Sequence, residues 1–180
     1  MKHLWQEQMD AAFDRYFAMS ELLQSDMEAL LVGDPKSQSL RRNFVRAACS
    51  LVEGYAHCYR DMCQVGVAAG PGPLNADETK VLTDERAFGS TDRVKLTVRA
   101  IFKLFELPNA PDFSQKGWPQ AQALFDRRDR LTHPKSVADL VVADEHWDIV
   151  YDGAAWIFEQ LFSFMRELNR VHGNGEVPAA

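Results

Sequence analysis

The residues best suited to chemistry lie in one segment, Arg127-Arg128-Asp129-Arg130-Leu131-Thr132-His133-Pro134-Lys135. A guanidinium such as that of Arg128 can bind a phosphate in a bidentate way and hold the negative charge that develops on it. An imidazole such as that of His133 can accept a proton when neutral and donate one when charged. The segment therefore carries groups for anion binding and for proton transfer.

Arg128 interrupts an apolar stripe on its own helix. Ala121, Leu124, Arg128 and Leu131 follow one another at steps of three and four residues, so Arg128 stands where an apolar side chain belongs. An arginine turned toward an interior or an interface needs a partner anion. We therefore expect an acidic group to meet Arg128.

Asp129 and His133 are four residues apart and share a helix face. The carboxylate can hold the imidazole in one tautomer, and the end of the helix favours a charged imidazole. Asp126 and Arg130 have the spacing of an ordinary exposed ion pair. The same residues are also compatible with a solvated helix end that a histidine caps, and spacing alone leaves that interpretation open.

A second polar stripe lies earlier in the chain and contains Arg46, Ser50, Glu53, His57 and Asp61. A solvent-facing side with ion pairs is the ordinary explanation of such a stripe. The alternative is that Glu53 faces Arg128 across a helical bundle. The sequence does not place the two helices together, so both interpretations stay open.

The elements that position these residues are helical almost throughout. The apolar spacing predicts helices at 3–32, 36–66, 76–87, 91–107, 118–132 and 144–171, with a loop at 66–73 and an extended or loop segment at 139–142. This pattern predicts an all-α, up-and-down bundle of four to five main helices. We expect one domain over 1–172 and a flexible tail at 173–180.

The composition of the 180 residues narrows the function classes. The net charge is −6, which argues against a generic nucleic-acid binder, so polynucleotide chemistry needs a local patch. Arg127, Arg130 and Lys135 can provide such a patch. No long apolar run predicts a membrane span or a signal peptide, and three cysteines do not make a disulfide framework, so we expect a cytoplasmic protein.

The usual sequence signatures of metal and cofactor sites are missing. The chain has no CxxC, HExxH, GxGxxG or P-loop pattern, and its five histidines show no metal-like pair. We therefore predict neither a metal nor a cofactor.

The segment from Arg128 to His133 resembles the R-x4–6-H motif of HEPN domains, in which a polar residue follows the arginine. Residues 42–55 are similar to the first core helix of many members, and the resemblance covers roughly 40–172. Arg166 and His172 match the loose spacing too, but they lie at the end of the last helix, without the motif's context. Toxins paired with nucleotidyltransferases usually have Tyr two positions after the histidine. Lys135 stands there, so adenylylation of that tyrosine is not expected.

The resemblance implies a bundle that forms a homodimer through its motif helices. It implies metal-independent cleavage of RNA, often in toxin, stress or antiphage systems, with Arg128, Asp129 and His133 as the catalytic residues and Glu53 as a candidate support. A second protein, such as an antitoxin, is a further candidate partner, and no membrane is expected. Other members are non-catalytic interaction modules, and a ligand pocket between helices is a third possibility. These alternatives remain open at the level of sequence.

Overall fold

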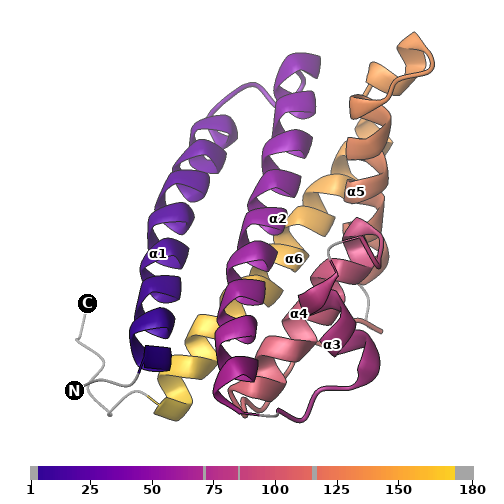
Figure 1. The fold of residues 1–180 in the computed structure, drawn as a ribbon. Coiled ribbons are helices and arrows are strands. Elements are labelled where there is room, and N and C mark those ends of the chain that lie inside the picture. Colours follow the sequence, from indigo (N-terminus) through magenta and orange to yellow (C-terminus); the bar gives the residue numbers. More distant parts are fainter. Residues whose placement is uncertain (1–3, 71, 85, 115–116, 173–180) are drawn as a thin grey trace.

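The computed structural model describes residues 4–70, 72–84, 86–114 and 117–172. Within these ranges the chain is all-α, as predicted, with no strand (Figure 1). The helices are α1 (Leu4–Leu31), α2 (Gln38–Ala69), α3 (Ala76–Thr83), α4 (Ser90–Leu104), α5 (Trp118–Thr132) and α6 (Asp144–His172), with a 3-10 helix at Val137–Leu140. The predicted tail at 173–180 lies outside the described residues.

Helix α2 is the centre of the bundle. It begins where the Ser37 side chain accepts a hydrogen bond from the Leu40 amide, and it contacts α1, α3, α4, α5 and α6. Figure 1 shows α1 running alongside it. Its buried side chains include Tyr55, Tyr59 and Met62, which are almost completely shielded from water. A polar residue on α2 can therefore face several other helices.

Helix α5 lies close against α6 because residue 153 is glycine. A Cβ atom at Gly153 would overlap the backbone of Gln120 and Ala121 on α5. Trp118, at the start of α5, packs against Phe113 with a centroid separation of 5.0 Å. These contacts fix the direction of α5 and so fix where its motif residues emerge.

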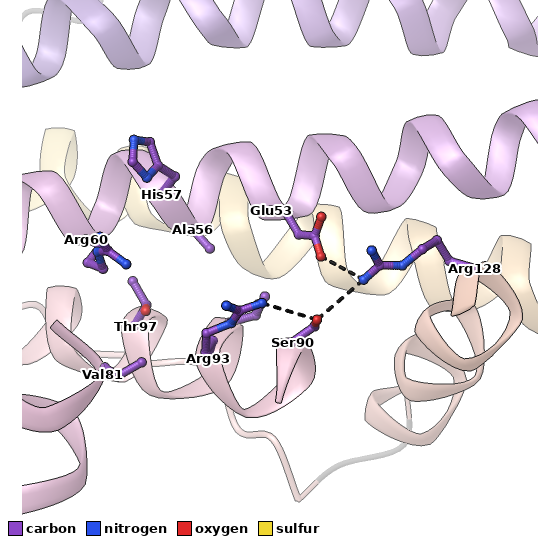
Figure 2. Close-up of a pocket in the computed structure, with 10 residues that line it drawn as sticks. Glu53, Ala56, His57, Arg60, Val81, Ser90, Arg93, Thr97 and Arg128 are labelled. Atoms are coloured by element: carbon purple, nitrogen blue, oxygen red, sulfur yellow. Dashed lines mark hydrogen bonds and ion pairs between the residues drawn. The ribbon is translucent and has the colours of Figure 1, made fainter. Parts of the chain in front are cut away.

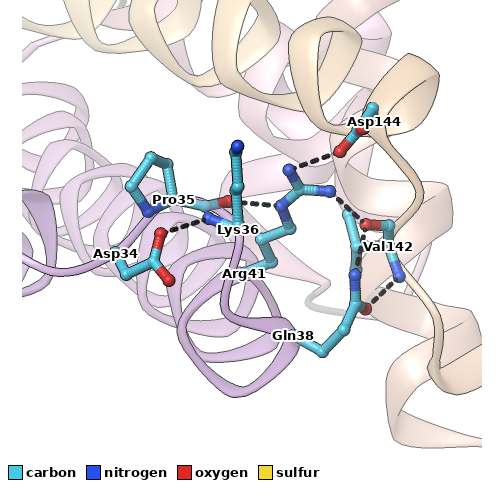
Figure 3. A network of polar contacts seen from close by, with 7 residues as sticks. All are labelled: Asp34, Pro35, Lys36, Gln38, Arg41, Val142 and Asp144. Carbon is cyan, nitrogen blue, oxygen red and sulfur yellow. Dashed lines mark hydrogen bonds and ion pairs between the residues drawn. The ribbon is translucent and has the colours of Figure 1, made fainter.

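The loop after α5 is anchored to the start of α2 (Figure 3). Arg41 donates hydrogen bonds to the carbonyl oxygens of Pro35 at 2.5 Å and Val142 at 2.7 Å, and to Asp144 Oδ1 at 2.6 Å. Gln38 both donates to and accepts from the Val142 backbone. The α1–α2 turn and the start of α6 are therefore held together through one buried arginine.

Several element boundaries differ from the predictions. Helix α2 continues to Ala69, past the predicted stop at Gly66, because the Gly66 carbonyl still accepts a hydrogen bond from Gly70 N–H at 3.3 Å. A Cβ at Gly66 would meet only Leu104 at 3.9 Å, so close packing does not require glycine at this position. Helix α3 ends at Thr83 instead of residue 87.

The segment predicted to be extended or a loop at 139–142 is helical over its first part. The 3-10 helix starts at Val137, and the Asp139 carboxylate accepts hydrogen bonds from the backbone N–H groups of Lys135 and Ser136, each at 2.9 Å. These bonds hold the pKa of Asp139 below its usual value. They also shape the turn that follows His133.

No helix in the described part of the chain has both the length and the apolar character needed to cross a lipid bilayer.

Candidate active site at the end of helix α5

Arg128 points from α5 toward α2 and meets Glu53 there. Its Nη2 atom lies 2.7 Å from Glu53 Oε1 and 3.4 Å from Ser90 Oγ on α4 (Figure 2). The guanidinium carbon is 5.8 Å from the centroid of the Phe125 ring. Glu53 therefore faces Arg128 across the bundle, which was one of the two interpretations left open by the sequence. Helices α2, α4 and α5 meet at this arginine.

The Arg128 side chain is only partly satisfied by these contacts. Its Nε atom lies 3.0 Å from Asp129 Oδ1, yet the N–H does not point at that oxygen, so the buried Nε has no hydrogen bond. The Arg128 side chain is 21% exposed and that of Glu53 is 39% exposed. Arg128 is thus held in place by Glu53 while part of it remains accessible to a ligand.

His133 ends α5 and its side chain is exposed. Its backbone N–H donates to the Asp129 carbonyl oxygen at 2.9 Å. The Asp129 carboxylate lies beside Arg128 and makes no hydrogen bond with the imidazole, so the predicted orienting contact is not formed in the described structure. From α2, Arg46 donates to the Leu131 carbonyl oxygen at 3.3 Å, which holds the end of the helix.

The three predicted RNA-binding residues fall in different environments. Arg130 and Lys135 are exposed near His133. Arg127 is buried, and its Nη1 atom donates to the Val141 carbonyl oxygen at 3.3 Å. Burial lowers the pKa of its guanidinium, and Arg130 lowers it further. Arg127 therefore packs the loop against α5 and adds little to an exposed positive patch.

The predicted ion pair between Asp126 and Arg130 is absent from the described residues, although both side chains are exposed. Four-residue spacing permits such a pair, but it adds little in water, where both groups are already well solvated.

A polar cleft of about 430 Å³ opens beside Arg128, between α2, α3, α4 and α5. Its lining carries three arginines, one carboxylate and one imidazole, which are Arg60, Arg93, Arg128, Glu53 and His57. His57 and Glu53 belong to the predicted polar stripe, whereas no sequence pattern points to Arg60, Arg93 or Ser90. Arg93 is one of several charged residues in the range 91–107, and the rotation of α4, which the sequence does not give, decides which of them faces the cleft.

Cys49 lies near Arg128 but is not suited to act as a nucleophile. Burial raises the pKa of its thiol to about 12, although the positive charge of Arg128 opposes this shift. The thiolate, which is the reactive form, is therefore scarce at neutral pH. The candidate groups for chemistry at this site are therefore the imidazole and the guanidinium.

Among the described residues, no group of three or more His, Cys, Asp or Glu side chains is arranged to hold a metal ion. Comparisons with protein-family models, with curated proteins and with solved structures found no match to this chain.

Proposed function

We propose that this protein is a metal-independent endoribonuclease of the HEPN type, with a composite site at a homodimer interface. The observation that carries the proposal is the arrangement at the end of α5. Glu53 holds Arg128 at the mouth of a polar cleft, and the exposed His133 stands five positions further along the chain. The resemblance of this segment to the R-x4–6-H motif supports the same assignment.

The cleavage step uses the substrate's own nucleophile. The neutral imidazole of one His133 takes the proton from a ribose 2′-OH, and the 2′-oxygen then forms a bond to the adjacent phosphorus. The bond from phosphorus to the 5′-oxygen breaks, and a protonated imidazole gives its proton to that oxygen. The products are a 2′,3′-cyclic phosphate and a 5′-hydroxyl.

A dimer explains how one residue type performs both proton transfers. A single imidazole cannot be both neutral and protonated in the same step, whereas two copies of His133 can divide these roles. Two-fold pairing would also bring two Arg128 guanidinium groups to the phosphate, where they oppose its developing negative charge. Arg130 and Lys135 would contact neighbouring phosphates. A role in toxin, stress or antiphage systems follows from the resemblance.

The experiment compares cleavage of labelled RNA by the purified chain in EDTA with cleavage by His133→Ala. We expect the native chain to cut RNA and His133→Ala to lose about 10²–10⁴-fold in rate while keeping its melting temperature. His146→Ala is the matched control, because His146 is an exposed histidine on α6. Equal cleavage by His133→Ala and the native chain would contradict the proposal.

A second candidate is a non-catalytic helical interaction module, and the Arg128–Glu53 ion pair favours it. In that case the pair serves only to join α5 to α2, and removing Arg128 would destabilise the bundle by more than the about 0–1 kcal/mol that is typical of an exposed ion pair. An intact RNA in EDTA, together with a large loss of stability in Arg128→Ala, would favour this candidate.

A further inference from the structure

The cleft beside Arg128 brings two positively charged side chains to one hydroxyl group. Ser90 Oγ accepts from Arg128 Nη2 at 3.4 Å and from Arg93 Nη2 at 3.3 Å, so two guanidinium groups from different helices converge on the same oxygen (Figure 2). Each guanidinium carries several N–H donors, so an anion that reaches both can accept hydrogen bonds from both. The arrangement is therefore suited to an oxyanion with several acceptor oxygens.

The charge of the cleft lining is opposite in sign to that of the whole chain. Three arginines and one glutamate line the cleft, whereas the chain as a whole has a net charge of −6. Glu53 is already engaged by Arg128. A cleft that concentrates one sign of charge attracts ligands of the other sign.

The size and the position of the cleft indicate which anion it can take. A volume of about 430 Å³ lies in the range of ligand pockets and exceeds what a single phosphate needs. The cleft begins at Arg128, the residue assigned to the scissile phosphate, and continues along α4 past Arg93 to Thr97. A nucleic-acid strand bound at Arg128 can therefore continue into it.

We propose that this cleft is the path of the RNA strand next to the cleaved bond, and that Arg93 binds the phosphate adjacent to the scissile one. This inference rests on the proposed function, since it uses Arg128 as its starting point. Arg93 is then a positioning residue: it holds the strand so that the 2′-OH and the phosphorus next to it meet His133. Ser90 sets the spacing between the two arginines by bonding to both.

The experiment measures binding of a 2′-O-methyl RNA oligonucleotide, which lacks the nucleophile and stays intact. Fluorescence anisotropy gives its Kd for the native 180-residue chain between 50 and 200 mM salt. The same titration is made for Arg93→Gln, Arg93→Lys and Arg166→Gln. Arg166 is an exposed arginine on α6 that is paired with Glu159 outside this cleft, so Arg166→Gln removes the same charge at an unrelated place.

We expect Arg93→Gln to weaken binding about tenfold, as for one lost charge-assisted contact. The slope of log K against log salt should become shallower by about 0.7, the value for one phosphate contact on a single strand. Arg93→Lys should keep the native slope because it keeps the charge, and Arg166→Gln should behave like the native chain. A native Kd and a native slope for Arg93→Gln would overturn the assignment of Arg93.

The outcomes separate this inference from the nuclease proposal. Binding that depends on Arg93, without cleavage of ordinary RNA, would support the cleft as an RNA path and contradict the nuclease. Cleavage with an unchanged KM in Arg93→Gln would leave the nuclease standing and overturn the role of Arg93. Absence of any binding by the native chain would overturn the inference, and cleavage assays would then decide the proposed function separately.

Discussion

Arg41 and Arg128 are both arginines that enter the helical bundle and pair with a carboxylate, but their surroundings differ. Arg41 is 4% exposed, and each of its three nitrogens donates to an oxygen of Pro35, Val142 or Asp144. Its guanidinium also lies 5.3 Å from the Trp147 ring centroid. Arg128 keeps one buried nitrogen without a hydrogen bond and borders a cleft of about 430 Å³.

The difference separates an arginine that joins parts of the fold from one that can bind a ligand. Each nitrogen of Arg41 already donates to a neighbouring oxygen, and the residue is only 4% exposed, so an outside group cannot reach it. Arg128 is oriented by Glu53, is 21% exposed and borders an open cleft. An ion pair in the interior is therefore not a functional signal by itself. The partial exposure of Arg128 and the adjacent cleft supply that signal.

Between the two arginines, the largest effect should appear in the cleavage rate of Arg128→Gln. Loss of the group that opposes charge on the phosphate should lower the rate about 10²–10³-fold. Single-turnover cleavage of labelled RNA measures this, with Arg166→Gln as the control that removes an exposed arginine. A rate within twofold of the native value would mean that Arg128 only joins helices, as Arg41 does.

Arg41→Ala should produce the largest loss of stability. It leaves the carbonyl oxygen of Pro35 without its donor, removes one of the two donors to the Val142 carbonyl oxygen and opens a gap beside Trp147. We therefore expect a decrease of about 2–4 kcal/mol in the free energy of unfolding. Urea denaturation followed by circular dichroism measures it. A change below about 0.5 kcal/mol would show that the buried network contributes little in solution.

The Glu53–Arg128 pair should contribute much less to stability. Both side chains are partly exposed, at 39% and 21%, so water screens the attraction. A double-mutant cycle with Glu53→Gln and Arg128→Gln should give a coupling energy of about 0.5–1 kcal/mol in the same denaturation assay. A coupling of 3 kcal/mol or more would mean that the pair, like Arg41, mainly stabilises the fold, and it would favour the interaction module.

The smallest effect concerns the Cys49 thiol near Arg128. Because the pKa of Cys49 is raised to about 12, its reactive thiolate becomes abundant only as the pH rises toward that value. We expect negligible labelling of Cys49 by a disulfide reagent at pH 8 in the native chain and full labelling in urea. Rapid labelling of the folded chain would show that the region around Arg128 opens more than the structure indicates.

Helix periodicity was sufficient to predict the fold class and the motif helix. The start of α5 at Trp118 and its end at Thr132 follow from proline chemistry and apolar spacing, and the inward position of Arg128 follows from the same spacing. The predicted end of α2 at Gly66 is too early, because a glycine inside a long, well-packed helix need not end it.

The contacts between helices were not predictable in the same way. Arg41 looked like its neighbour Arg42 in the sequence, and only the fold shows that Pro35, Val142 and Asp144 surround it. The cleft depends on how α4 is rotated toward α2, which spacing within α4 does not determine. Spacing can also suggest a contact that is not formed. Asp129 and His133 are four residues apart, but in the described structure the Asp129 carboxylate lies beside Arg128 instead.

The most direct test of the account is the chemistry of the cut ends. A DNA oligonucleotide that contains one ribonucleotide is incubated with the native chain in EDTA, and the masses of the fragments are measured by mass spectrometry. We predict a single cut after the ribonucleotide, with a 2′,3′-cyclic phosphate on one fragment and a 5′-hydroxyl on the other. An uncut strand, or cuts that leave a 5′-phosphate, would contradict the assignment of Arg128 and His133 to this reaction.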